Sequence, residues 1–269
     1  MLTILDNRVS GNLIIIGGAE DKKGNKIILK QVANSLDKEN DELVIVAVAS
    51  KIPKELGREY KDIFTSLGVK NISILDVNKR EDAFCNKNVE IINKASMVFF
   101  TGGDQLRITS IIGGTELFKA MKRSYESGCT YVGTSAGASV MSDTMIISGA
   151  NDESPRKCTL KMAPGLGFIN DVIIDQHFAQ RGRIGRLLVA IAENPQSIGI
   201  GIDEDTAILI NEKAEFKVIG SGAVYVIDGS GITKSNVSEQ NQNDVLSMFN
   251  IKMHVLNKEN KFDLNRRIP

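Results

Sequence analysis

Five short apolar runs in the first half of the sequence constrain its fold most strongly. They are rich in β-branched residues and almost free of polar ones, which is typical of strands buried on both faces of a parallel sheet. Helical patterns lie between several of them, at residues 26–36, 53–67 and 115–127. This alternation predicts an α/β fold with a doubly wound, mainly parallel sheet and helices on both faces. The apolar runs cover residues 13–17, 43–49, 72–77, 97–101 and 131–133.

The second half of the chain is less regular. A helix is predicted over about residues 182–193, and a polar, turn-rich segment extends from residue 229 to 244. No internal repeat or linker is visible, so we expect one domain over residues 1–269. Further strands are predicted over residues 172–178, 198–202, 206–210 and 216–227.

Composition excludes several classes of protein. The 33 basic and 33 acidic residues cancel, so no excess of charge favours nucleic acid. The first residues do not have the pattern of a secretory signal, and no apolar run approaches membrane-spanning length. We therefore expect a cytoplasmic protein without nucleic-acid or membrane partners. Cys85, Cys129 and Cys158 show no C-x-x-C spacing, which predicts buried apolar cysteines rather than a disulfide or a zinc site.

A serine between two glycines stands where the fifth apolar run ends. The sequence Gly133-Thr-Ser135-Ala-Gly137 matches the G-x-S-x-G pattern, in which a strained turn between a strand and a helix presents a nucleophile. The alternative is an ordinary tight turn after a strand. Residues 131–132 and 136–141 supply the strand before the serine and the helix after it, which favours a nucleophile elbow.

A nucleophilic serine needs a base, and the chain contains only two histidines. His177 ends a predicted parallel strand, where open α/β sheets place their ligands. His254 lies in an alternating segment, which predicts an ordinary position on a late edge strand. His177 is therefore the candidate base.

The base in turn needs a carboxylate to orient it, and three acids follow the strand over residues 198–202. Side chains alternate along a strand, so Asp203 and Asp205 share one face and Glu204 points to the other. We expect Glu204 to face the histidine, while a solvated acidic turn is the alternative. The order serine, histidine, glutamate differs from that of α/β-hydrolases.

Five motifs together closely resemble the cyanophycinase family across about residues 11–230. The resemblance implies a fold like that of class I glutamine amidotransferases and a serine exopeptidase with a triad of Ser135, His177 and Glu204. It further implies an intracellular homodimer that hydrolyses cyanophycin, a poly-aspartate with arginine on its side-chain carboxyls, into β-aspartyl-arginine dipeptides. The motifs lie at residues 17–20, 101–105, 133–138, 175–178 followed by three arginines, and 201–204.

The glycines that follow the fourth apolar run suggest an oxyanion hole. Glycine backbones approach a ligand closely, so the amides of Gly103 and of Ala136, which follows the serine, are the expected donors. Asp104 is also expected to cap the next helix. The pair Gly17-Gly18 lacks the G-x-G-x-x-G pattern and predicts no nucleotide cofactor. We expect activity without any cofactor or metal.

Charged and amide side chains near His177 are candidates for substrate contacts. Forked guanidinium groups suit the free carboxylates of such a polymer, and a solvated helix start is the alternative for the arginines. An acid should meet the polymer's guanidinium, and the choices are Asp175, Asp152 and Glu153. The full set of predicted substrate contacts is Gln105, Asp175, Gln176, Arg181, Arg183 and Arg186.

Two other functions remain open at the level of the sequence. An aspartyl or isoaspartyl dipeptidase of the same family would share the triad and differ in its substrate pocket. A non-hydrolytic binding protein on the same fold would tolerate loss of the base or its carboxylate. All three triad residues are present, which counts against the binding protein.

Overall fold

An eight-stranded sheet forms the centre of the computed structural model, which describes residues 8–151, 153–156, 160–239, 241 and 244–269. Five neighbouring strands of this sheet are parallel, in the spatial order β1, β5, β4, β2, β3. They confirm the five strands predicted from the apolar runs. These strands are β1 (Leu13–Ile16), β2 (Glu42–Val46), β3 (Asn71–Ile74), β4 (Met97–Phe100) and β5 (Thr130–Thr134).

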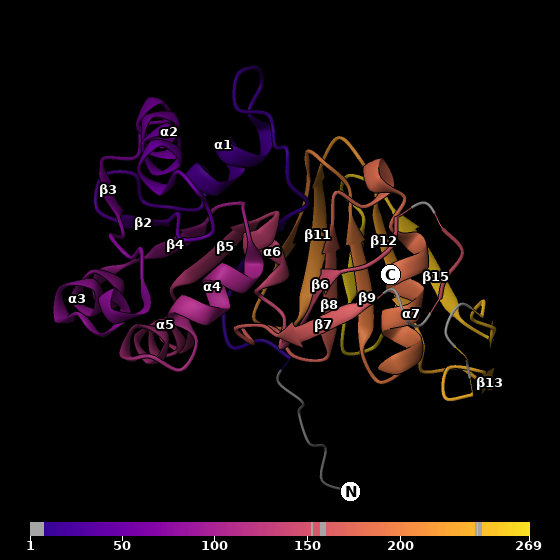
Figure 1. Ribbon diagram of the computed structural model, residues 1–269. Coiled ribbons are helices and arrows are strands. Elements are labelled where there is room, and N and C mark those ends of the chain that lie inside the picture. The colour runs from indigo at the N-terminus through magenta and orange to yellow at the C-terminus, as the bar shows by residue number, and fades with distance from the viewer. Residues whose placement is uncertain (1–7, 152, 157–159, 240, 242–243) are drawn as a thin grey trace, which may run out of the picture.

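Helices cover both faces of the parallel strands, as predicted (Figure 1). One face packs against α1 (Ile27–Asn34) and α2 (Pro53–Ser66). The opposite face packs against α3 (Asn86–Lys94), α4 (Gln105–Ile112) and α5 (Glu116–Glu126). Helix α3 and the 3-10 turn η1 (Arg80–Phe84) before it were not predicted, whereas α4 is the helix expected after Asp104. None of the helices in the described part of the chain is long and apolar enough to cross a membrane.

The remaining strands of the central sheet run antiparallel beside β1. They are β10 (Thr206–Ile210), β11 (Glu215–Gly220) and β16 (Lys261–Asp263). The prediction of one strand over residues 216–227 is wrong, because β11 and β12 (Val224–Asp228) belong to different sheets. The chain changes direction at Gly220, which has a φ of 103° and lies so close to Asp205 that a side chain would overlap its carbonyl.

A second sheet contains the strand that leads to His177. Its order is β15, β12, β9, β8, and only β8 and β9 are parallel. Helix α7 (Ile184–Glu193) packs against it, and apolar side chains of both sheets meet in one hydrophobic cluster. His254 lies on the edge strand β15, as predicted. The strands are β8 (Val172–Gln176), β9 (Ile198–Ile202), β12 and β15 (Lys252–Leu256).

Short elements complete the fold around these two sheets. Helix α6 (Ala136–Ser139) follows β5, and the 3-10 turn η3 (Ala179–Arg181) follows β8. Two small two-stranded sheets are formed by β6 (Thr144–Ser148) with β7 (Lys161–Pro164), and by β13 (Lys234–Ser235) with β14 (Met248–Phe249).

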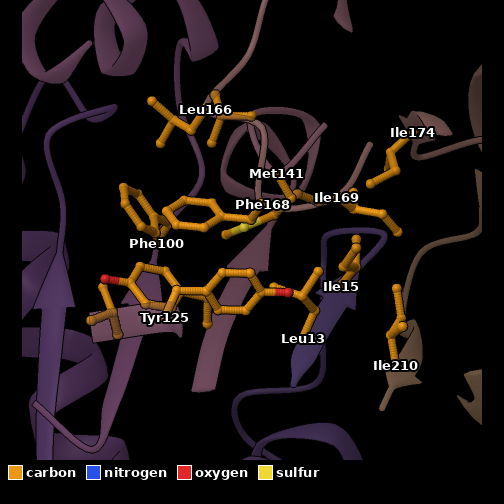
Figure 2. Packing of buried hydrophobic residues seen from close by; sticks show 14 of the residues in the cluster. Leu13, Ile15, Phe100, Tyr125, Met141, Leu166, Phe168, Ile169, Ile174 and Ile210 are labelled. Atoms are coloured by element: carbon orange, nitrogen blue, oxygen red, sulfur yellow. The ribbon is translucent and has the colours of Figure 1, made fainter. Parts of the chain in front are cut away.

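Aromatic rings pack among aliphatic side chains in the hydrophobic cluster (Figure 2), which also contains Ala136, the residue after Ser135. Phe168 stacks on Tyr131 with 4.4 Å between ring centroids and meets Tyr125 edge-on at 5.2 Å. Cys129 is buried, as expected, whereas Cys85 is exposed because it stands between η1 and α3 at the surface. Cys158 lies outside the described residues.

Loss of the Phe168 ring should destabilise the protein strongly. Phe168 is 1% exposed, so Phe168→Ala removes buried contacts and leaves a cavity, and we expect the free energy of unfolding to fall by about 3–5 kcal/mol. Urea denaturation measures this change. The matched control is Phe249→Ala, because Phe249 is 52% exposed and its loss should change stability little. Equal effects of the two substitutions would contradict this view of the core.

Candidate active site

Ser135 occupies a tight turn between β5 and α6. Its φ is 53°, a conformation that residues other than glycine rarely adopt, and its amide donates to Ile16 O at 3.1 Å. A side chain at Gly133 would overlap the backbone of Gly137, and one at Gly137 would overlap that of Phe100. Both glycines of the G-x-S-x-G pattern are therefore required by close packing of the backbone.

His177 follows the last residue of β8 and lies within hydrogen-bond distance of two predicted partners. Its Nε2 is 2.9 Å from Ser135 Oγ, and its Nδ1 is 2.6 Å from Glu204 Oε1. The residue is 7% exposed and has a φ of 48°. With the Nδ1 proton donated to Glu204, Nε2 can accept the hydroxyl proton of Ser135.

Glu204 lies between β9 of the second sheet and β10 of the central sheet. The acids beside it bond elsewhere: Asp203 accepts from the amides of residues 179 and 223, and Asp205 accepts from the amide of Asp21 and the hydroxyl of Ser221. Among the three consecutive acids, Glu204 is the one that bonds to His177.

The Gly17-Gly18 loop packs directly against this constellation. The amide of His177 donates to Gly17 O at 2.8 Å, and a side chain at Gly18 would overlap the imidazole ring. Gly18 also has a φ of 97°, which disfavours other residues. The sequence analysis counted this loop among the family motifs and rejected it as a nucleotide site, but it missed the contact with the histidine.

Burial lowers the pKa of His177 below its usual 6.5, because a charged ring would lose its hydration. The hydrogen bond that His177 donates to Glu204 opposes this shift, and the charges of Arg181 and Arg183 add to it. The imidazole is therefore neutral at neutral pH, the state that a proton acceptor requires.

The glycine loop after β4 lies beside Ser135. A side chain at Gly102 would contact Ser135 Cβ at 3.3 Å, and one at Gly103 would overlap the backbone of Ala49. In the described part of the chain, the amides of Gly102, Gly103 and Ala136 donate to no hydrogen-bond acceptor. Asp104 caps α4 as predicted, since its Oδ1 accepts from the Leu106 amide at 2.9 Å.

Four predicted substrate residues form one buried network instead of lining an open surface. Arg186 binds both oxygens of Asp175, with 2.6 Å between Nε and Oδ2. Arg183 Nη1 donates to Gln176 O at 2.5 Å and to its Oε1 at 3.1 Å. Burial, outweighing the charge of Asp175, lowers the pKa of Arg183 to about 10. Because Asp175 is 1% exposed and already paired with Arg186, its carboxylate is not open to a substrate guanidinium.

The other predicted contacts lie apart from this network. Arg181 is exposed, and its guanidinium makes no hydrogen bond to the described residues. Gln105 begins α4 and donates to the carbonyls of Ile146 and Ile147, at 3.0 and 3.2 Å. Glu153 is exposed, and Asp152 lies outside the described residues.

A pocket opens beside the serine and contains an acid that sequence reasoning did not assign. Glu20 Oε1 accepts from Tyr60 Oη at 2.5 Å, and its Oε2 accepts from Thr134 Oγ1 at 2.6 Å. The available signal in the sequence was the position of Glu20 at the end of the motif Gly17-Gly-Ala-Glu20. In the described residues, no group of three or more histidine, cysteine or acidic side chains is arranged to hold a metal. The pocket is lined by Ala19, Glu20, Lys22, Leu56, Tyr60, Gly102, Thr134, Ser135 and His177.

Comparison with known proteins identifies the family. Residues 13–218 match the model of peptidase family S51. The chain belongs to peptidase family S51. Cyanophycinases of Geminocystis herdmanii and a Nostoc species are each 36% identical to it; the alignments cover 96% and 95% of this chain and 95% and 86% of those proteins. These matches confirm the resemblance seen in the motifs.

Solved structures confirm the α/β fold of this S51 peptidase. A peptidase from an acI-B1 actinobacterium superimposes with a TM-score of 0.66 at 22% identity, covering 96% of this chain and 98% of that one. A putative peptidase E protein from Listeria monocytogenes gives a TM-score of 0.55 at 18% identity, covering 79% and 99%.

Titration of the S51 peptidase should give a His177 pKa below 6.5, since burial disfavours the imidazolium. Glu204→Gln should lower this pKa further, because the carboxylate stabilises the charged ring. Because the folded state binds this proton less readily than the unfolded state does, the free energy of unfolding should fall as pH drops below 6.5. Ring-proton NMR measures both values, with His177→Gln used to assign the signal. A pKa above 6.5, or a rise in Glu204→Gln, would contradict the geometry.

Proposed function

We propose that this S51 peptidase is a serine exopeptidase that hydrolyses cyanophycin into β-aspartyl-arginine dipeptides. The observation that carries the proposal is the continuous chain of hydrogen bonds from Ser135 through His177 to Glu204, at 2.9 and 2.6 Å. The substrate follows from the cyanophycinases that share 36% of their aligned residues with this chain.

The proposed reaction begins when Ser135 Oγ attacks the scissile carbonyl carbon and its proton passes to His177 Nε2. Glu204 holds the ring in the required orientation and stabilises its positive charge. The carbonyl oxygen becomes an oxyanion, and in this proposal the amides of Gly103 and Ala136 donate hydrogen bonds to it. Collapse breaks the C–N bond, and His177 returns the proton to the leaving amine.

Water completes the cycle by attacking the acyl-serine ester. His177 removes a proton from this water, the second tetrahedral intermediate forms, and its collapse releases the carboxylate and restores the Ser135 hydroxyl. The proposed steps use side chains and backbone amides of this chain together with water. The strained φ of Ser135 fits this role, since strain at a nucleophile is retained where the surrounding structure holds it in place.

Guanidinium groups near the base supply the proposed selectivity for a substrate rich in carboxylates. Arg181 is the exposed member, while Arg183 is buried beside Gln176 and keeps its Nε without a partner among the described residues. A charge-assisted bond from either to a substrate carboxylate contributes about 1.5–3 kcal/mol. We further propose that the enzyme acts in the cytoplasm as a homodimer.

Removal of triad residues should abolish hydrolysis without unfolding the protein. Ser135→Ala and His177→Ala should each lower kcat for cyanophycin by about 10⁴-fold or more, because nucleophile and base act as a unit. Glu204→Gln should cost less, since the ring stays in place without its anionic partner. Release of soluble dipeptide measures the rates, and circular dichroism verifies folding. Substantial turnover by Ser135→Ala would exclude the serine mechanism.

The products should identify the substrate class. Purified enzyme should release β-aspartyl-arginine from cyanophycin, seen by mass spectrometry, and should cleave α-aspartyl dipeptides at least about 10-fold more slowly, as loss of one charge-assisted contact implies. Faster cleavage of α-aspartyl or isoaspartyl dipeptides would assign a dipeptidase instead. Binding without any hydrolysis would assign a non-hydrolytic protein.

A further inference from the structure

The pocket beside Ser135 carries charges that the triad does not use. Glu20 is 5% exposed, and its two oxygens accept from the hydroxyls of Tyr60 and Thr134. Thr134 directly precedes Ser135 in the sequence, so the Glu20 carboxylate contacts the residue next to the serine. Leu56 and the ring of Tyr60 supply apolar surface around it.

A second charge stands at the same pocket. Lys22 Nζ lies 4.3 Å from the centroid of the Tyr60 ring and 3.3 Å from Glu59 Oε2. Its side chain is 26% exposed, so the ammonium group borders both the pocket and solvent. Tyr60 thus stands between a carboxylate and an ammonium group.

The Tyr60 hydroxyl remains a donor to Glu20 throughout the physiological range of pH. Burial, then the charge of Glu20, raises the pKa of Tyr60 well above 10. Glu20 keeps further lone pairs on each oxygen beyond the two hydroxyl bonds, since a carboxylate accepts about four hydrogen bonds. A second donor can therefore reach it from the pocket.

A group that fits this pocket has a flat cationic end, an apolar stem and a separate carboxylate. Arginine joined through its amino group to an aspartate side chain has these three parts, because its guanidinium and its α-carboxylate are both free. Of the three acids that the sequence offered for that guanidinium, Asp175 is paired with Arg186. Glu20 is open to the pocket that Ser135 and His177 also line.

We propose that the pocket formed by Glu20, Lys22, Leu56 and Tyr60 binds the β-linked arginine branch of the substrate. Glu20 receives the guanidinium, Leu56 and Tyr60 pack on the stem, and Lys22 pairs with the branch carboxylate. This assignment rests on the proposed function and adds a site for the branch next to the nucleophile. Charge-assisted pairing at a nearly dry carboxylate gives selectivity for arginine over a neutral side chain of the same shape.

Binding to a protein that cannot turn over tests the Glu20 contact. Calorimetry with the Ser135→Ala protein compares β-aspartyl-arginine with β-aspartyl-citrulline, in which a neutral urea group replaces the guanidinium. We expect the arginine peptide to bind about 10- to 100-fold more tightly, which corresponds to one charge-assisted contact. Adding Glu20→Gln should remove that preference. The control is Glu55→Gln, which changes an exposed acid on α2 and should leave the preference unchanged.

The Glu20 assignment is overturned if Glu20→Gln lowers the affinity for the arginine peptide and the citrulline peptide equally. That outcome means that Glu20 acts by holding Thr134 and the serine turn. Thermal unfolding of each variant shows whether Glu20→Gln remains folded. If it does not, Tyr60→Phe replaces it: the carboxylate stays, one oxygen is freed, and the arginine preference should persist or rise. Its disappearance would also reject the assignment.

The Lys22 contact has its own test. Lys22→Gln should weaken binding of β-aspartyl-arginine about 10-fold and leave β-aspartyl-argininamide unchanged, because the amide has no carboxylate to pair. If the Ser135→Ala protein that keeps Lys22 binds the two ligands equally well, this contact is rejected. Failure of the proposed function would give a different result. The wild-type protein would then release no dipeptide from cyanophycin, whether or not the pocket binds arginine more tightly than citrulline.

Discussion

The contact between the Gly17-Gly18 loop and His177 is the constraint on which the site depends. Ser135 stands on the central sheet and His177 follows a strand of the second sheet, so the two must be brought together across the junction. Gly17 O accepts from the His177 amide, and Gly18 O accepts from the Asp205 amide at 2.9 Å. One loop therefore holds the base and the residue after Glu204. A side chain on either glycine would force the two sheets apart.

The same loop reaches the nucleophile from its other end. Glu20 accepts from Thr134, and the Ser135 amide donates to Ile16, the last residue of β1. Contacts at both ends of the loop thus resist relaxation of the Ser135 backbone from its φ of 53°. The aromatic core shown in Figure 2 adds rigidity because a packed interior deforms little. Catalytic geometry here follows from the way the two sheets meet.

Sequence predicted the features that local patterns encode and missed those that depend on distant contacts. The parallel strands follow from their apolar runs, and Ser135, His177 and Glu204 were found because each ends a strand with a distinctive residue. The break at Gly220 was missed, because its cause is the approach of Asp205, fifteen residues away in the sequence. The pairing of Asp175 with Arg186 could not be predicted either, since the sequence does not distinguish a buried arginine from an exposed one.

Charge on the two sides of Ser135 is arranged so that the base stays neutral while charged substrate groups still find partners. Asp175 pairs with Arg186, and the charges of Arg181 and Arg183 disfavour the imidazolium of His177. On the other side, the acid of the pocket is held by two neutral hydroxyls rather than by a cation. Glu20 has no paired cation among these bonds, whereas the carboxylate of Asp175 is already occupied by Arg186, so a cation entering the pocket meets less competition at Glu20. The proposed substrate contact and the proposed proton transfer therefore use different acids, although both depend on the loop after β1.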